Sequence, residues 1–329
     1  MINYSLSQKF LHKICLSNNF VKKISFEFDN FFIKNKDLSI KNNQHVFITG
    51  LARSGTTAIL NFFYEQNIFA SLTYNDMPFI LAPKISNFLN KNNIDKKFIR
   101  LHKDGIVYKY SSPEALDEIF WKTYNDEEVS DYLSKYIYQI LKKYKKSRYL
   151  SKNNYNYKRI NKIKSIFPNS YFVITYRNPL QQAYSLFNQH KNFIEMQTQD
   201  KFILDYMNWL GHTEFGLGYK NWYKPILYHN SMKIDHWLEQ WYLFYSNLLK
   251  NISNFDKLIL LSYEDLCNNS NTLLYLIKKL NLNTVFDRTY FISNNKTITS
   301  TFDKQLMVKS NKIYEKMQDS SKNILSSYS

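Results

Sequence analysis

One short segment constrains this chain more than any other. Residues 46–57 read Val-Phe-Ile-Thr-Gly-Leu-Ala-Arg-Ser-Gly-Thr-Thr. The spacing of Gly50, Gly55 and Thr57 matches G-x-x-x-x-G-K-[ST], a loop whose backbone N–H groups bind nucleotide phosphates. Apolar residues before the loop predict a buried strand, and the residues after it predict a helix. The segment therefore predicts an α/β fold with a phosphate-binding turn between a strand and a helix.

The loop departs from this pattern at one position, because Thr56 replaces the lysine. That lysine would reach the terminal phosphates of ATP or GTP, so its absence argues against phosphoryl transfer from a nucleoside triphosphate. Arg53 supplies a cation nearby, and a guanidinium can bind phosphate or sulfonate oxygens through two hydrogen bonds. A 5′-phosphate is expected to bind the amides of Ser54, Gly55, Thr56 and Thr57 at the start of the helix.

A second segment also points to a bound phosphate. Residues 171–179 read Tyr-Phe-Val-Ile-Thr-Tyr-Arg-Asn-Pro, an apolar strand that ends at Arg177, and Ser185 follows eight residues later. Together the two segments resemble the 5′-phosphosulfate loop and the 3′-phosphate element of sulfotransferases, best in the bacterial and tyrosylprotein-sulfotransferase-like branch. The resemblance spans roughly residues 45–265. It implies the donor 3′-phosphoadenosine 5′-phosphosulfate (PAPS), with Arg177 and Ser185 on its 3′-phosphate.

The resemblance also carries over to two other strand ends. Lys152, in Leu-Ser-Lys-Asn-Asn, corresponds to a lysine that approaches the transferred group in a Lys-[Ser/Thr/Asp]-Pro motif, although asparagine replaces the proline here. The alternative is an exposed loop lysine in a lysine-rich chain. Tyr263, in Ser-Tyr-Glu-Asp-Leu, resembles a strand exit of the family, which implies a contact with the donor.

Transfer to a hydroxyl needs a base that removes the hydroxyl proton. Asp76 lies where the tyrosylprotein-like branch has its catalytic glutamate, and we expect it to be this base; its alternative role is a helix N-cap ahead of Pro78. His102 is the rival, because a neutral imidazole titrates near physiological pH and histidine is the base in other branches. Arg53, Lys152 and the loop amides would stabilise the transferred group.

Patterning along the rest of the chain alternates between helix and strand. Amphipathic helices are expected within residues 1–40, from 75–78 and 112–114 onward, over 130–146 and after 179. The apolar residues of 237–248 recur at helical spacing and predict a core-facing helix, with an aromatic stacking platform as the alternative. Buried strands are expected at 46–48, 69–73, 148–151, 171–175 and 257–262.

Alternating strands and helices predict a P-loop-like, mostly parallel sheet with helices on both faces and ligands at the strand carboxyl ends. We expect a single domain in which 1–44 form a helical extension, 45–265 the donor-binding core and 266–329 a helical C-terminal segment. Segments 74–115 and 190–230 are expected to shape the acceptor pocket.

Charge and cysteine content limit the kinds of partner, cofactor and cellular compartment that we expect. The net charge of +17 indicates either an anionic partner or a solvated, lysine-rich surface. The basic cluster 142–146 ends an expected helix, where the helix dipole favours cations without any nucleic acid. Cys15 and Cys267 form neither a disulfide framework nor a metal site, which favours a reducing compartment and no metal cofactor. Lysines interrupt every apolar N-terminal stretch, so a cytoplasmic protein without a membrane anchor is expected.

We therefore expect a PAPS-dependent sulfotransferase that acts on a hydroxyl of a carbohydrate, lipid or small metabolite and releases adenosine 3′,5′-bisphosphate (PAP). A nucleotide or small-molecule kinase is the alternative enzyme, disfavoured by Thr56, Arg177 and Ser185. The non-enzyme alternative is a basic nucleic-acid-binding protein. It would show a continuous basic stripe with interleaved aromatic residues, whereas the charges here are scattered.

Overall fold

The centre of the protein is a sheet of five strands, all paired in parallel, in the order β2-β5-β1-β6-β7. We analysed it in a computed structural model that describes residues 4–31, 38–89, 97–99, 107–251, 257–282, 290–293 and 295–326. The strands are β1 (Val46–Thr49), β2 (Phe69–Ala70), β5 (Arg148–Lys152), β6 (Tyr171–Tyr176) and β7 (Leu258–Ser262). The predicted parallel α/β sheet is thus confirmed.

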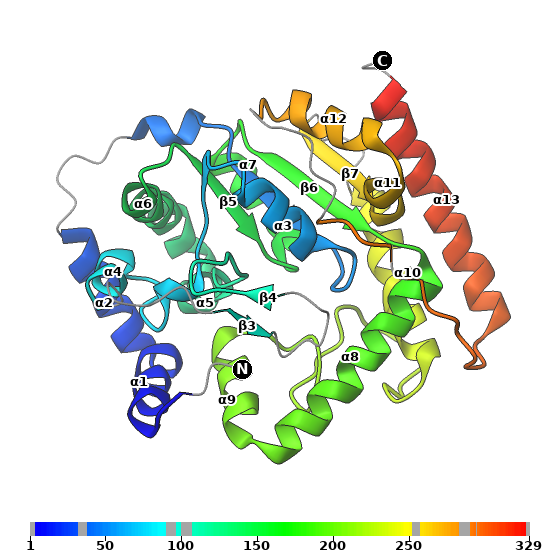
Figure 1. The fold of residues 1–329 in the computed structure, drawn as a ribbon, viewed down its shortest axis with the longest axis horizontal. Helices are drawn as coiled ribbons and strands as arrows, with labels where there is room; N and C mark the ends of the chain where they lie inside the picture. The colour runs from blue at the N-terminus through cyan, green and yellow to red at the C-terminus, as the bar shows by residue number, and fades with distance from the viewer. Residues whose placement is uncertain are drawn as a thin grey trace.

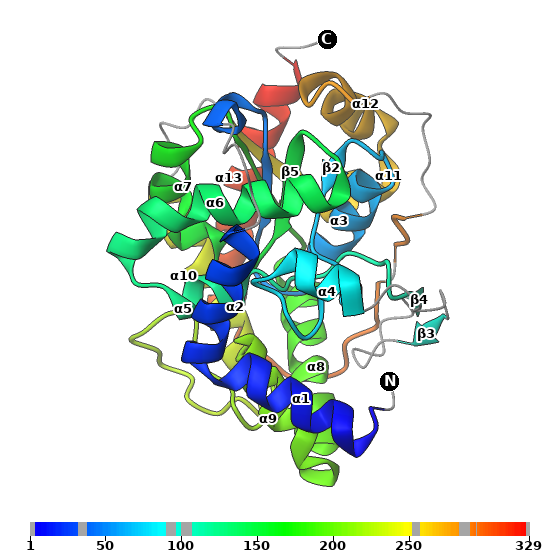
Figure 2. The same cartoon turned by 90° about the vertical axis from the view of Figure 1, so that its left-hand side faces the viewer.

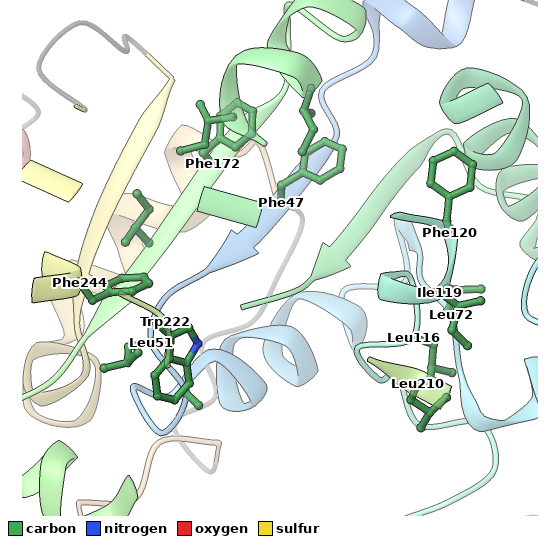
Figure 3. Close-up of a cluster of buried hydrophobic side chains, with 14 of the residues drawn as sticks. Phe47, Leu51, Leu72, Leu116, Ile119, Phe120, Phe172, Leu210, Trp222 and Phe244 are labelled. Atoms are coloured by element: carbon green, nitrogen blue, oxygen red, sulfur yellow. The ribbon is translucent and has the colours of Figure 1, made fainter. Parts of the chain in front are cut away.

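Helices cover both faces of this sheet (Figure 1). On one face Val46 and Ile48 pack with α3 (Thr56–Tyr64), α11 (Tyr263–Asn268) and α12 (Ser270–Lys279). On the other face Phe47 and Phe172 join a larger core (Figure 3), to which α6 (Asp126–Tyr144), α7 (Ile160–Ile166), α10 (Ile234–Asn251) and α13 (Lys304–Ser326) contribute. This alternation follows from the two-residue period of a strand, whose successive side chains point to opposite faces.

The remaining elements lie mostly toward the carboxyl end of the sheet. They are α1 (Leu6–Ser17), α2 (Asn19–Phe31), α4 (Pro83–Leu89), α5 (Glu118–Thr123), α8 (Pro179–Gln199), α9 (Lys201–Leu210) and the antiparallel pair β3 (Phe98–Ile99) and β4 (Val107–Tyr108). Short 3₁₀ turns occur at Leu38–Asn42, Tyr74–Asp76 and Asn156–Lys158. The N-terminal helix α1 packs on α9, although the two are distant in sequence (Figure 2).

The aromatic stripe on α10 is a core element. Trp237 and Trp241 have no exposed surface, and Phe244 and Tyr245 are likewise fully buried. Burial of large aromatic side chains is a major stabilising contribution in a domain of this size. The predicted core-facing helix is therefore confirmed.

Two expected helix starts are wrong. No helix begins at 75–78 or at 112–114; α4 begins at Pro83 and α5 at Glu118. The reason is a pairing between these two segments: Thr73 forms a bridge with Pro113, and the amide of Glu114 donates to the carbonyl of Leu72 at 3.0 Å. The strand expected at 69–73 is accordingly only Phe69–Ala70, and the chain then passes into the 3₁₀ turn.

Candidate active site

The loop after β1 depends on two glycines. Gly50 has φ 147°, and a Cβ there would lie 2.5 Å from the carbonyl oxygen of Thr175 on β6. Gly55 has φ 92°, and a Cβ there would lie 2.3 Å from Cδ2 of Tyr263. Both positions require glycine, because a side chain would meet strained backbone geometry and a close neighbour at once. The hydroxyls of Ser54 and Thr175, 2.7 Å apart, hold the loop against β6.

Helix α3 begins at Thr56, directly after Gly55 at its N-cap. Gly55 has no side chain with which to cap the helix, so no N-cap side chain binds the first-turn amides. The positive end of the helix dipole lies at the same place, next to the loop. Thr56 and Thr57 also line a cavity at this position. A helix N-terminus of this kind binds phosphate, sulfate or carboxylate groups.

Arg53 occupies a left-handed conformation, with φ 68°. A non-glycine residue in this region is uncommon and is maintained only where the surroundings determine it. Its Nε donates a hydrogen bond to Oγ of Ser185 on α8, at 3.1 Å. Two residues predicted for different ends of the donor are therefore in direct contact, and Arg53 also lines the cavity.

The ends of β6 and β7 bring together the other predicted donor residues. The guanidinium of Arg177 lies over the ring of Tyr263, 5.4 Å from its centroid. The carboxylate of Glu264 accepts a hydrogen bond from the amide of Asn178 at 2.9 Å, which fixes the two strand exits relative to each other. Asn178 caps α8 through the amides of Leu180 and Gln181. Arg177 thus has a cation–π contact on the flank of the phosphate loop.

A cavity of about 160 Å³ lies between the phosphate loop and α9. Arg53, Thr56, Thr57 and Lys152 line it beside the loop, and both segments expected to shape the acceptor pocket contribute residues to it. The segment before α5 contributes Tyr74, Tyr108 and Glu114, and the segment that includes α9 contributes Phe202, Tyr206, His212 and Glu214. The cavity therefore joins an anion-binding helix end to a set of aromatic and carboxylate side chains.

Lys152 is the last residue of β5, and its neighbours in the chain are firmly anchored. The hydroxyl of Ser151 donates to Asp117 at 2.5 Å, and the side-chain Nδ2 of Asn153 donates to the same carboxylate at 3.0 Å. Burial raises the pKa of Asp117, although the bonds from Ser151 and Asn153 and the charge of Arg159 act in the opposite direction. This buried network fixes the strand end from which Lys152 enters the cavity.

His212 and Glu214 form a histidine–carboxylate pair in the cavity, and neither residue was predicted from the sequence. Nδ1 of His212 lies 3.8 Å from Oε2 of Glu214, and Asn154 donates to Oε1 of Glu214 at 3.2 Å. Asn154 stands where the resemblance has proline, so the departure from the motif supplies the donor that holds Glu214. One local feature of the sequence could have indicated a loop here. Gly211, directly before His212, is the left-handed C-cap that ends α9.

The pKa values of this pair move apart. Burial lowers the pKa of His212, but the carboxylates of Glu214 and Glu114 outweigh burial, and the pKa of His212 is raised overall. Burial raises the pKa of Glu214, but His212 outweighs it, and the pKa of Glu214 is lowered overall. Opposite charges at close range favour the ionised form of both partners. The pair is therefore a carboxylate that favours the protonated form of a neighbouring histidine.

Asp76 is not one of the described residues that line this cavity. Its side chain has no exposed surface, and its Oδ1 accepts from Nζ of Lys143 at 2.7 Å. Its Oδ2 accepts from the hydroxyl of Tyr144 at 2.6 Å and from the amide of Thr73 at 2.7 Å. Asp76 occupies the third position of a capping box that Thr73 begins, rather than the N-cap position. His102 lies outside the described residues.

No cluster of three or more His, Cys, Asp or Glu side chains in the described ranges has the geometry to hold a metal ion. Among the helices that the structure describes, none combines the length and apolar character needed to cross a membrane.

A comparison with known protein families gives one match to this chain. A family model described as the sulfotransferase family matches residues 45–214. The chain belongs to the sulfotransferase family. The matched span of this sulfotransferase-family chain contains the phosphate loop, Lys152, Arg177 and Ser185, and it ends at Glu214; Tyr263 lies beyond it.

Two solved structures are similar to this sulfotransferase-family chain. One is sulfotransferase STF1 from Mycobacterium tuberculosis H37Rv, at 12% identity and a TM-score of 0.47, over 93% of this chain and 85% of that one. The other is sulfotransferase STF9 from Mycobacterium avium, at 9% identity and a TM-score of 0.45, over 96% of this chain and 79% of that one. No curated protein matches the sequence.

Proposed function

We propose that this chain transfers a sulfuryl group from PAPS to a hydroxyl acceptor and releases PAP. One observation carries the proposal: the uncapped N-terminus of α3, in a loop that lacks the kinase lysine, lines the same cavity as Lys152. A helix end of this kind can hold a single phosphate or sulfonate, but it lacks the lysine that contacts the terminal phosphates of ATP in kinases. Membership of the sulfotransferase family supports the same reaction class.

The donor would lie along the carboxyl edge of the sheet. Its 5′-phosphate would bind the amides of residues 54–57, and Arg53 would bind the phosphate or sulfonate oxygens. Its 3′-phosphate would bind Arg177 and Ser185, with the ring of Tyr263 beside them. Since Arg53 contacts Ser185, the two phosphate sites share a hydrogen bond and are expected to influence each other.

In the transfer step the acceptor oxygen forms a bond to sulfur, and the bond between sulfur and the bridging phosphate oxygen breaks. PAP leaves with the electron pair of that bond. Arg53, Lys152 and the loop amides would stabilise the charge that develops on the leaving phosphate and the sulfonate oxygens. Preorganised donors of this kind are effective because they need no rearrangement during the reaction.

The acceptor proton must pass to a base, and we propose that His212 receives it. His212 lines the cavity, and Glu214 beside it stabilises the imidazolium that forms. Asp76 was predicted for this role, but its carboxylate is bound by Lys143, Tyr144 and Thr73 and is not part of the cavity wall. A base must come within hydrogen-bonding reach of the proton, which favours His212 over Asp76.

We also propose the division made from the sequence, with residues 45–265 as the donor-binding core. Both flanking segments contact this core: Tyr4 of the N-terminal segment lines the cavity, and α13 of the C-terminal segment packs on β7.

The donor proposal can be tested by thermal unfolding of the purified chain with PAP, AMP, ATP or GTP. A ligand at about a hundred times its Kd stabilises the native state by about 2.7 kcal/mol, because it binds only the folded protein. We expect PAP to raise the melting temperature more than the other three nucleotides. A larger shift with ATP and Mg²⁺ than with PAP would favour the kinase alternative and overturn the proposal.

A further inference from the structure

We propose that helices α1, α2 and α4 bind the surface of an anionic lipid membrane through apolar side chains that point outward. The main residues of this surface, which we call the N-terminal apolar face, are Leu6, Phe10, Ile14, Phe20, Ile24 and Phe88. Helix α2 contacts both α1 and α4, and the three helices lie together at one edge of the molecule (Figures 1 and 2). None of the six residues lines the cavity at the phosphate loop.

Exposed apolar side chains are concentrated on these three helices. Among the described residues seventeen large apolar side chains are exposed, and ten of them belong to α1, α2 and α4. Leu6, Phe10 and Ile14 recur every four residues on α1, and Phe20 and Ile24 continue that spacing on α2, so each set lies on one side of its helix. Single exposed apolar residues are ordinary, but a contiguous set of them marks a surface that binds a partner.

The inner side of α2 is polar, the reverse of an ordinary surface helix. Phe26 is fully buried against the rings of Tyr124 and Tyr136, which fixes the side of the helix that faces the protein. Lys22 and Asp29 are buried on that inner side, where Oδ1 of Asp29 accepts from the first backbone amides of α4 at 3.0 and 3.2 Å. Polar groups inside and phenylalanines outside are unfavourable in water alone. The sequence of α2 therefore suits an apolar environment on its outer side.

Charge indicates an anionic partner. Helix α1 carries Lys9 and Lys13 and no acidic residue, and Lys13 is exposed three residues after Phe10, on the same side of the helix. Lys9 also lies 3.8 Å from Asp200, whereas Glu27 is an exposed carboxylate of α2. The chain as a whole has a net charge of +17. A second copy of the chain would bring the same charge to this face, whereas anionic lipid headgroups bring the opposite charge.

Composition favours a lipid surface over an acidic protein. Helices α1 and α2 contain no Tyr, Trp or Arg, although the chain has 27 tyrosines. These three residue types are the ones enriched among the residues that dominate protein–protein binding. The N-terminal apolar face consists of Phe, Leu and Ile, whose side chains can enter the boundary between headgroups and acyl chains while neighbouring lysines stay among the headgroups. The helices would lie in the plane of the membrane, since no helix that the structure describes could cross one.

The experiment is co-sedimentation of the full chain with lipid vesicles. One set of vesicles contains phosphatidylcholine and phosphatidylserine, and the other contains phosphatidylcholine alone. We expect the wild type to bind the vesicles with phosphatidylserine more tightly. Lys13→Gln should weaken that binding by roughly fivefold, the contribution of one basic residue near an anionic surface. Leu6→Ser and Phe20→Ser should each weaken it by roughly tenfold or more, because each removes a large apolar side chain from the contact.

Leu227→Ser is the matched control for Leu6→Ser. Leu227 is 83% exposed in the segment before α10, and Leu6 is 87% exposed on α1, so the same change is made at two equally exposed leucines. The control should bind vesicles as the wild type does. All of these variants should keep the wild-type melting temperature, since they replace exposed side chains.

Loss of vesicle binding in Leu6→Ser and Phe20→Ser, with binding kept in Leu227→Ser, supports the proposal. Failure of the wild type to bind vesicles with phosphatidylserine overturns it. Binding that high salt abolishes but that Leu6→Ser and Phe20→Ser leave unchanged also overturns it, because lysines elsewhere would then carry the adsorption. A wild type that binds no vesicles but sediments as a dimer, which Phe20→Ser converts to a monomer, assigns the face to a second copy and overturns it as well.

Discussion

Nε of Arg53 donates a hydrogen bond to Oγ of Ser185 across 132 residues of chain, at 3.1 Å. The bond joins the phosphate loop after β1 to the helix that follows β6. Arg53 is held in a left-handed conformation at this position, with φ 68°. The two residues are predicted to contact opposite ends of one nucleotide, and their contact would make the proposed donor site a connected unit whose parts can be tested together.

Arg53→Ala should weaken PAP binding by about 2 kcal/mol or more, which is roughly thirtyfold, because it removes a charge-assisted contact. Arg53→Lys keeps the charge but loses the planar guanidinium, so its affinity for PAP should lie between those of the wild type and Arg53→Ala. Calorimetry with PAP measures both variants. Combined with Ser185→Ala, Arg53→Ala should give a non-additive loss, since the two side chains share a hydrogen bond. Wild-type PAP affinity in Arg53→Ala would remove Arg53 from the donor site.

Arg177→Ala should discriminate between two nucleotides. Its guanidinium is proposed to bind the 3′-phosphate, which PAP has and AMP lacks, so PAP should lose far more affinity than AMP. The measurement is the ratio of the two dissociation constants in the variant and in the wild type. If both nucleotides weaken by the same factor, Arg177 acts only through its packing on Tyr263 and the second phosphate site lies elsewhere.

His212→Ala should leave PAP binding unchanged and reduce turnover by roughly 10²–10⁴-fold, the usual contribution of a positioned base. Turnover should rise as pH increases through the pKa of His212, because only the neutral imidazole can accept a proton. Glu214 raises that pKa, so Glu214→Gln should move the acidic limb of the pH–rate profile to lower pH. A profile that stays in place in Glu214→Gln would show that His212 does not control the reaction.

Asp76→Asn separates two roles for this carboxylate. The variant leaves Lys143 buried without its partner charge, and breaking a buried ion pair in this way costs about 3–5 kcal/mol of stability. We expect a lower free energy of unfolding in urea, with near-normal turnover per folded molecule. The general-base hypothesis expects the opposite, a variant of unchanged stability that binds PAP and turns over roughly 10²–10⁴-fold more slowly.

The parts of the site predicted from the sequence are those that a local pattern encodes. Gly50, Gly55 and Thr56 indicate the turn and the helix start by their spacing, Arg177 follows an apolar run typical of a buried strand, and Lys152 follows the strand predicted at 148–151. Parallel strands then bring those ends to one edge of the sheet, so their proximity follows from the fold class.

The parts that were missed depend on contacts between distant segments. The prolines at 78 and 113 have polar neighbours typical of helix starts, but backbone hydrogen bonds between 72–75 and 110–114 hold both segments out of helices. The environment of Asp76 comes from α6, 67 residues away, and no local pattern announces it. His212 and Glu214 come from a loop after α9 that is held by hydrogen bonds to side chains of α8, which no local pattern in the loop indicates.

The most direct measurement is a crystal structure of the chain with PAP bound. We predict the 5′-phosphate on the backbone amides of residues 54–57 and the 3′-phosphate on Arg177 and Ser185. The open face of the 5′-phosphate should be directed into the cavity that Lys152 and His212 line. A PAP molecule bound away from the N-terminus of α3, or one whose 3′-phosphate makes no contact with Arg177, would contradict the proposed donor site.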